Sequence, residues 1–180
     1  MRVLVLYATT EGQTRKICRF AADRLVSEGH SVELLNAEDA EGLDAGRFDA
    51  ALLAGSVHIG KIQPALIAAA REHAGALAKM PTLYLQVSLA AAGKDPGELE
   101  ELREIAREAA EGFGWEPSRT EQVAGAFRFS EYDFFKSWAM RWIASQHRQE
   151  VDPGRDRDYT DWTALGEILD DWAASAAERR

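Results

Sequence analysis

The 180-residue sequence has a single cysteine and no long apolar run. Cys18 cannot form an internal disulfide by itself, so a reducing compartment is expected. A membrane-spanning helix needs about 20 consecutive apolar residues. The apolar residues 3–7 are too few for the hydrophobic part of a signal peptide. These absences predict a cytoplasmic protein.

Basic residues are also scarce, because 21 Lys and Arg stand against 30 Asp and Glu, a net charge of −9. Nucleic-acid phosphates are bound by clustered Lys and Arg, so no nucleic-acid partner is predicted. A metal centre is not predicted either, since no histidine is spaced from others as a metal ligand would be. The histidines are His30, His58, His73 and His147.

Short apolar segments alternate with amphipathic ones along the chain. Residues 2–7, 31–35, 49–53, 82–87 and 122–127 are predicted strands. Residues 13–28, 64–78, 98–113 and 161–176 are predicted helices. Such alternation is typical of an α/β fold with a doubly wound, five-stranded parallel sheet, here in the order 2-1-3-4-5. Residues 1–180 are expected to form one domain.

The six acids of residues 98–111 are expected to form a solvated helix face with Arg103 and Arg107. Cys18 falls inside the first predicted helix, where it is expected to be a small buried apolar residue.

The sequence Thr9-Thr10-Glu11-Gly12-Gln13-Thr14 joins the first predicted strand to the first helix. A helix N-terminus offers unpaired N–H groups and the positive end of the helix dipole, so it can bind a phosphate without Lys or Arg. In a doubly wound sheet this loop lies at the ligand-binding edge. The loop matches neither a Walker A motif nor a dinucleotide fingerprint. It predicts a phosphate site, and the alternative is an ordinary helix cap.

This loop resembles the [ST]-x-T-G-x-T loop with which the flavodoxin-like family binds the phosphate of FMN. Glu11 replaces one hydroxyl residue, and it is expected to point to solvent because a carboxylate repels a phosphate. A closer resemblance is to the bacterial, quinone-dependent protoporphyrinogen dehydrogenases of the flavodoxin type. It covers residues 6–17, 55–60, 87–89, 123–129 and 159–162. The sequences at 124–129 and 159–162 are not general flavodoxin features, so they carry most of the specificity.

The resemblance implies an FMN cofactor, with residues 55–60 and 87–94 lining its isoalloxazine ring. Thr9, Thr10, Gln13 and Thr14 are expected to donate hydrogen bonds to the phosphate through hydroxyl, amide and backbone groups. The full set of expected cofactor contacts is Thr9, Thr10, Glu11, Gly12, Gln13, Thr14, Ser56, Val57, His58, Ile59, Gly60, Val87, Ser88 and Leu89.

His58 is the candidate catalytic residue of this set, because an imidazole can carry a proton near neutral pH. The alternative is an exposed loop histidine. The pair His58-Ile59 stands where the family has a basic residue followed by Tyr.

Residues 129–160 form a long connection between the fifth predicted strand and the last helix. Long connections are usually functional or contain structure of their own. Its aromatic residues are spaced for one face of a helix, and residues 127–148 carry a local positive charge. A helical cover over the flavin edge, a membrane-surface contact and plain core packing remain open. The residues expected to form the cover are Phe129, Phe134, Phe135, Trp138 and Trp142.

The family resemblance implies an enzyme of haem biosynthesis. It would use FMN to oxidise protoporphyrinogen IX to protoporphyrin IX, with a quinone as electron acceptor, at the inner face of the cell membrane. The alternatives are a flavodoxin-type electron carrier, which suits the net charge of −9, and a general quinone reductase. A phosphoacceptor signalling domain is excluded, because Ala54-Gly55-Ser56 stands where it needs an Asp. The oligomeric state is not predicted.

Overall fold

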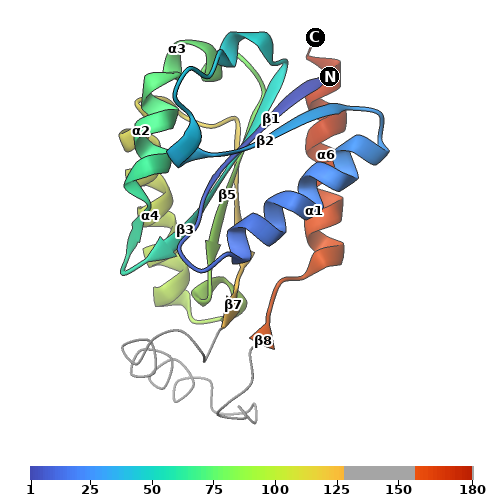
Figure 1. The fold of residues 1–180 in the computed structure, drawn as a ribbon. Helices are drawn as coiled ribbons and strands as arrows, with labels where there is room; N and C mark the ends of the chain where they lie inside the picture. Colours follow the sequence, from blue (N-terminus) through green and yellow to red (C-terminus); the bar gives the residue numbers. More distant parts are fainter. Residues whose placement is uncertain (128–156, 180) are drawn as a thin grey trace.

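The computed structural model describes residues 1–127 and 157–179, which form a parallel sheet between two layers of helices (Figure 1). Neighbouring strands follow the order β2-β1-β3-β5-β6, and each pair is parallel. These are the first to fifth long strands along the chain, so the predicted order 2-1-3-4-5 is confirmed. The strands are β1 (Arg2–Ala8), β2 (Ser31–Asn36), β3 (Ala50–His58), β5 (Thr82–Ser88) and β6 (Arg119–Ala124).

Helices cover both faces of the sheet because its central strands are apolar on both faces (Figure 1). In β1, Val3 and Val5 belong to the core under α1 and α6, whereas Leu4 and Leu6 belong to the core under α2 and α4. All four side chains are fully buried. The helices are α1 (Gln13–Ser27), α2 (Pro64–Glu72), α3 (Ala74–Leu77), α4 (Pro96–Phe113) and α6 (Trp162–Glu178). Short 3-10 helices are η1 (Ala37–Asp39), η2 (Ala45–Arg47) and η3 (Ala90–Ala92).

The third strand is longer than predicted. Instead of ending near residue 53, β3 continues to His58 and returns as β4 (Lys61–Ile62), which pairs antiparallel with it. Pairing with β1 reaches Gly55 and pairing with β5 reaches Ser56, so hydrogen bonds on both sides override the weak strand preference of Gly and Ser. The predicted loop 55–60 is therefore a strand end and a tight hairpin.

Two further boundaries differ from the prediction. The predicted helix 64–78 is divided at His73, which caps both α2 and α3 and has φ −98° and ψ 13°. The predicted strand 122–127 is β6 followed by a separate strand, β7 (Ala126–Phe127). Gly125 N–H still bonds to the Ser88 carbonyl of β5 at 2.9 Å, whereas the Gly125 carbonyl accepts from the Tyr159 N–H at 3.1 Å, so the chain changes its pairing partner at this residue. β7 pairs antiparallel with β8 (Arg157–Asp158), so the two described chain ends that flank residues 128–156 lie side by side.

Most of the predicted insertion 129–160 lies outside the described residues, and so do Phe129, Phe134, Phe135, Trp138 and Trp142. Within the described part of the chain, no helix has the length and apolar character required to cross a membrane. Asp161 caps α6 by accepting hydrogen bonds from the N–H groups of Thr163 and Ala164, so the helix begins one residue after the predicted start.

Candidate functional site

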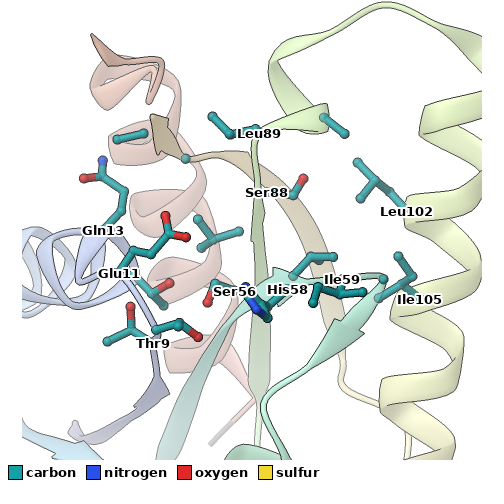
Figure 2. Close-up of a pocket in the computed structure, with 18 of the residues that line it drawn as sticks. Thr9, Glu11, Gln13, Ser56, His58, Ile59, Ser88, Leu89, Leu102 and Ile105 are labelled. Carbon is teal, nitrogen blue, oxygen red and sulfur yellow. The ribbon is translucent and has the colours of Figure 1, made fainter. Parts of the chain in front are cut away.

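A cavity of about 720 Å³ opens at the carboxyl edge of the sheet (Figure 2). Ligand pockets are typically about 300–1,000 Å³, so a small organic ligand fits here. All of the predicted cofactor contacts line the cavity except Gly12. Ala90 also lines the cavity, within the predicted ring-lining segment 87–94. The sequence reasoning missed a further group of lining residues, which comes from α4 and from the chain directly after β6: Glu98, Glu101, Leu102, Ile105, Gly125 and Ala126.

The loop after β1 presents an uncapped helix N-terminus to this cavity. Gly12 precedes α1 with φ 85°, a left-handed conformation that favours glycine, and no side chain caps the helix. The Gly12 N–H donates to Thr9 Oγ1 at 3.0 Å, which folds the loop back on itself. Thr14 lines the cavity in the first turn of α1, and its fully buried hydroxyl has no hydrogen-bond partner. Such a group is costly to bury, so the site fits a ligand that accepts this hydrogen bond.

Gln63 connects the loop after β1 to the end of β3. Its Nε2 donates to Thr10 Oγ1 at 3.1 Å and also to Ser56 Oγ, while its Oε1 accepts from the Ser56 N–H at 3.1 Å. One side chain therefore fixes the spacing of two walls of the cavity. No sequence pattern marked Gln63, because it meets these partners only in the folded chain.

The β3–β4 hairpin forms the next wall. Its turn contains Ile59, which has φ 50° and a side chain that is 72% exposed, an unusual backbone state for a β-branched residue. Gly55 is packed tightly, since a Cβ there would lie 2.8 Å from Leu66 Cδ2 and 2.9 Å from Ile62 Cγ2. Close packing within the protein thus explains this glycine. His58 lines the cavity at the hairpin and is partly buried.

The start of α1 is tied to the chain segment that precedes α6. Asp158 accepts from Gln13 Nε2 at 3.0 Å, from Lys16 Nζ at 2.7 Å and from the Thr160 N–H at 3.0 Å. Burial raises the pKa of Asp158, but the hydrogen bonds from Lys16, Thr160 and Gln13 outweigh it, so the pKa lies below its usual value. Thr160 Oγ1 also donates to the Ala124 carbonyl at 2.7 Å.

Helix α4 closes the cavity on the side away from the loop after β1 (Figure 2). Gln86 is fully buried in β5, and its Nε2 donates to the Leu102 carbonyl at 2.8 Å. This bond holds α4 to the sheet and directs Leu102 and Ile105 to the cavity. Arg103 and Arg107 do pair with Glu100 and Glu104 on the solvated face. Glu98 departs from the expected solvated face, because it is only partly exposed and lines the cavity, whereas Glu101 is exposed at the edge of the cavity.

A sequence model described as "Flavodoxin domain" matches residues 4–153. The chain belongs to the flavodoxin-domain family. A curated relative from Escherichia coli strain K12, named protoporphyrinogen IX dehydrogenase (quinone), is 27% identical over 162 residues, which are 90% of this chain and 89% of that protein. A relative of the same name from Leishmania major is 26% identical over 174 residues, which are 96% of this chain and 75% of that protein.

Solved flavodoxin structures share the fold. The Streptococcus pneumoniae TIGR4 flavodoxin has a TM-score of 0.54 at 13% identity and covers 97% of this chain and 99% of its own. A short-chain flavodoxin associated with a non-canonical PDU bacterial microcompartment has a TM-score of 0.56 at 10% identity, with 98% and 99% covered. At these identities the comparison supports the flavodoxin-like fold alone.

Membership of the flavodoxin-domain family confirms the prediction that the cofactor is FMN. The residues present fit its phosphate, because the unpartnered Thr14 hydroxyl and the uncapped N–H groups of α1 converge where an anion is stabilised. The cavity of this flavodoxin domain is thus polar at the N-terminus of α1 and apolar beneath α4.

The side chains of Gln13 and Glu11 are oriented differently from the expectation. The Gln13 amide donates both of its hydrogens to Asp158 and Thr160, so this side chain does not reach toward a phosphate as expected. Glu11 is partly buried and lies on the cavity side of its loop rather than pointing only to solvent (Figure 2). The local sequence could not predict either orientation, because both orientations depend on segments that are distant in the sequence.

Among residues 1–127 and 157–179 there is no cluster of His, Cys, Asp or Glu that could hold a metal ion. Cys18 is fully buried in α1, and burial raises the pKa of its thiol, as expected for a packing residue.

Proposed function

We propose that this flavodoxin-domain protein oxidises protoporphyrinogen IX to protoporphyrin IX and delivers the electrons to a quinone. The curated relatives with this name cover most of the chain, and they support an oxidoreductase. The observation that supports the specific porphyrinogen and quinone activity is the position of β7 and β8 at the edge of the cavity. Gly125 and Ala126 line the cavity, so the segment between Phe127 and Arg157 departs from the cavity edge and returns to it. An electron carrier needs only the flavin site, so added chain at the cavity edge favours an enzyme.

FMN, when bound, supplies the acceptor for the electron pairs removed from the porphyrinogen. The chain anchors and orients this cofactor. Thr14 and the first N–H groups of α1 bind the phosphate, while Ser56, Val57 and the hairpin flank the ring. His58 is the proposed catalytic residue, because its imidazole lies in the cavity and can hold or move a proton released from the substrate.

Two parts of the proposal rest on sequence. Phe129, Phe134, Phe135, Trp138 and Trp142 are proposed to cover an apolar substrate at the flavin edge. The protein is proposed to work in the cytoplasm, with a peripheral contact to the inner face of the cell membrane, where a lipid-soluble quinone is available.

The deciding experiment is anaerobic mixing of FMN-loaded protein with protoporphyrinogen IX. Loss of flavin absorbance together with a rise in porphyrin fluorescence is expected, and addition of a quinone should restore the flavin absorbance. Free FMN at the same concentration is the control for uncatalysed oxidation. If the flavin stays oxidised while porphyrinogen remains, the substrate assignment is wrong.

A second candidate is a flavodoxin-type electron carrier, favoured by the net charge of −9. A carrier would exchange single electrons with a partner protein and would form no porphyrin in the same experiment. A general quinone reductase would reoxidise with quinone but leave porphyrinogen unchanged. Porphyrin fluorescence therefore separates the proposed enzyme from both alternatives. Reoxidation by quinone of holoprotein that has been reduced photochemically separates the quinone reductase from the carrier.

A further inference from the structure

Gln63 lies directly before α2, where the start of the helix holds its backbone in place. Pro64 is the first residue of α2, and the Gln63 carbonyl accepts from the N–H groups of Leu66 at 3.1 Å and Ile67 at 3.4 Å. The side chain is partly buried, and its Oε1 lies 3.6 Å from the position that a Cβ on Gly55 would occupy. The Gln63 amide therefore reaches the end of β3 from a fixed origin.

A backbone group sets the direction of the Gln63 amide. The Ser56 N–H donates to Gln63 Oε1 at 3.1 Å, and only the oxygen of a side-chain amide can accept this hydrogen bond. The other amide atom is therefore the nitrogen, and its two hydrogens are donated to Thr10 Oγ1 at 3.1 Å and to Ser56 Oγ. One amide thus bonds the loop after β1 and the end of β3 at the same time.

These bonds decide the role of two hydroxyl groups. A hydroxyl that accepts a hydrogen bond keeps its own hydrogen available for donation. Within the described part of the chain, neither Thr10 nor Ser56 donates its hydroxyl hydrogen to another group. Both residues line the cavity. The two hydroxyls can therefore donate to a ligand in the cavity, and the N–H groups of Gln63 polarise them as donors.

We propose that Gln63 is a positioning residue of the FMN site, which makes Thr10 a hydrogen-bond donor to the phosphate and Ser56 a donor to the rest of the cofactor. Thr10 belongs to the loop at the N-terminus of α1, where the phosphate is stabilised, whereas Ser56 lies where the pairing of β3 with β5 ends. Gln63 does not line the cavity, so it acts through these two residues. The inference concerns the cofactor and goes beyond the proposed oxidation, which could fail without affecting it.

A double-mutant cycle tests whether Gln63 acts through the two hydroxyls. FMN is removed from the full-length protein, and FMN or riboflavin is titrated back while flavin fluorescence is recorded. The ratio of the riboflavin Kd to the FMN Kd isolates the contribution of the phosphate, which riboflavin lacks. Gln63→Met keeps the length of the side chain and removes its hydrogen bonds. It should lower this ratio about tenfold, the size of one hydrogen bond to a charged group.

The second half of the cycle starts from variants that lack one hydroxyl. In a Thr10→Val protein, adding Gln63→Met should leave the ratio unchanged, because the hydroxyl through which Gln63 acts is already gone. Gln63→Met should also raise the riboflavin Kd about threefold to tenfold, the size of one uncharged hydrogen bond. This rise should be absent in a Ser56→Ala protein. A merely structural role of Gln63 would instead weaken binding equally in every background.

Gln63→Glu separates the direction of the hydrogen bonds from the integrity of the fold. A carboxylate oxygen still accepts from the Ser56 N–H, but a carboxylate cannot donate, so the hydroxyl hydrogens of Thr10 and Ser56 turn toward it and away from the ligand. The ratio should fall at least as far as in Gln63→Met. It should stay low at about 1 M salt, where repulsion between the new charge and the phosphate is screened over roughly 3 Å.

Gln122→Met is the matched control. Gln122 accepts from Gln86 Nε2 at 3.1 Å and does not line the cavity, so the variant loses an amide hydrogen bond without disturbing either hydroxyl. It should bind both flavins as the unmodified protein does. An equal fall of the ratio with and without the Thr10 hydroxyl, or full recovery of the ratio at high salt in Gln63→Glu, would overturn the proposal. No measurement here uses porphyrinogen, so failure of the proposed oxidation is seen separately as missing porphyrin fluorescence.

Discussion

Replacing Thr14 with Val should change stability and cofactor affinity in opposite directions. The substitution exchanges a hydroxyl for a methyl of similar size at a fully buried position whose hydroxyl has no partner. A buried polar group without a hydrogen bond costs about 1–3 kcal/mol, so the Val variant without FMN should be more stable by about 1–2 kcal/mol. Bound FMN loses one hydrogen bond to a charged group, worth about 1.5–3 kcal/mol. Its Kd should therefore rise roughly 10- to 100-fold.

Thr82→Val is the matched control. Thr82 is equally buried, but its Oγ1 accepts a hydrogen bond from the Ser118 N–H at 2.9 Å. The same substitution leaves that N–H without a partner, so it should lower the free energy of unfolding by about 1–2 kcal/mol. Thr82 lies at the start of β5, at the opposite end of the strand from the cavity, so FMN affinity should not change.

Urea unfolding of both variants without FMN, followed by circular dichroism, measures the first effect. Quenching of flavin fluorescence during titration measures the second, with riboflavin as the ligand that lacks the phosphate. Riboflavin should bind the Thr14→Val variant as well as it binds the unmodified protein. Loss of stability in Thr14→Val, or equal weakening of FMN and riboflavin, would refute the assignment of Thr14 to the phosphate.

Three further predictions follow from the site. Gly55→Ala should destabilise the protein by about 1–3 kcal/mol in urea unfolding, because its Cβ would overlap two side chains, whereas Gly75→Ala has open space and should not. Asp158→Asn should lower the free energy of unfolding near neutral pH. The difference in the free energy of unfolding between the variant and the unmodified protein should become smaller below about pH 4, measured by unfolding at a series of pH values. The lowered pKa of Asp158 means that the fold stabilises only its ionised carboxylate, which is lost as the pH falls. Ile59→Gly should leave the melting temperature unchanged or slightly higher, because it relieves a positive φ that costs about 1–2 kcal/mol and removes a mostly exposed side chain.

The parallel sheet and the loop proposed to bind the phosphate could be predicted from the sequence, because both depend on contiguous residues. A run such as residues 3–7 is apolar on both faces only where helices cover both sides of a sheet, which predicted the layers. The strand order was the one expected for a five-stranded doubly wound fold. The loop 9–14 contains its glycine, its hydroxyls and the start of its helix within one turn. Thr14 therefore reaches the helix N-terminus whatever the rest of the chain does.

The wall of the cavity formed by α4 depends on packing that no local sequence pattern records. The helical spacing of Leu102 and Ile105 is the same whether they pack on a sheet or face a ligand. The buried core residues Ile105 and Phe113 and the bond from Gln86 to the Leu102 carbonyl together hold α4 against the sheet, with Glu101 at the cavity.

Polar contacts between distant segments were equally out of reach of the sequence. Gln63 meets Thr10 across 53 positions, and Gln13 meets Asp158 across 145. A local pattern records which residues are polar, but hydrogen bonds form only between groups that folding brings within about 3 Å. The sequence therefore predicted most residues of the cavity near α1, and the packing of α4, the hairpin and β8 decided which further side chains surround it.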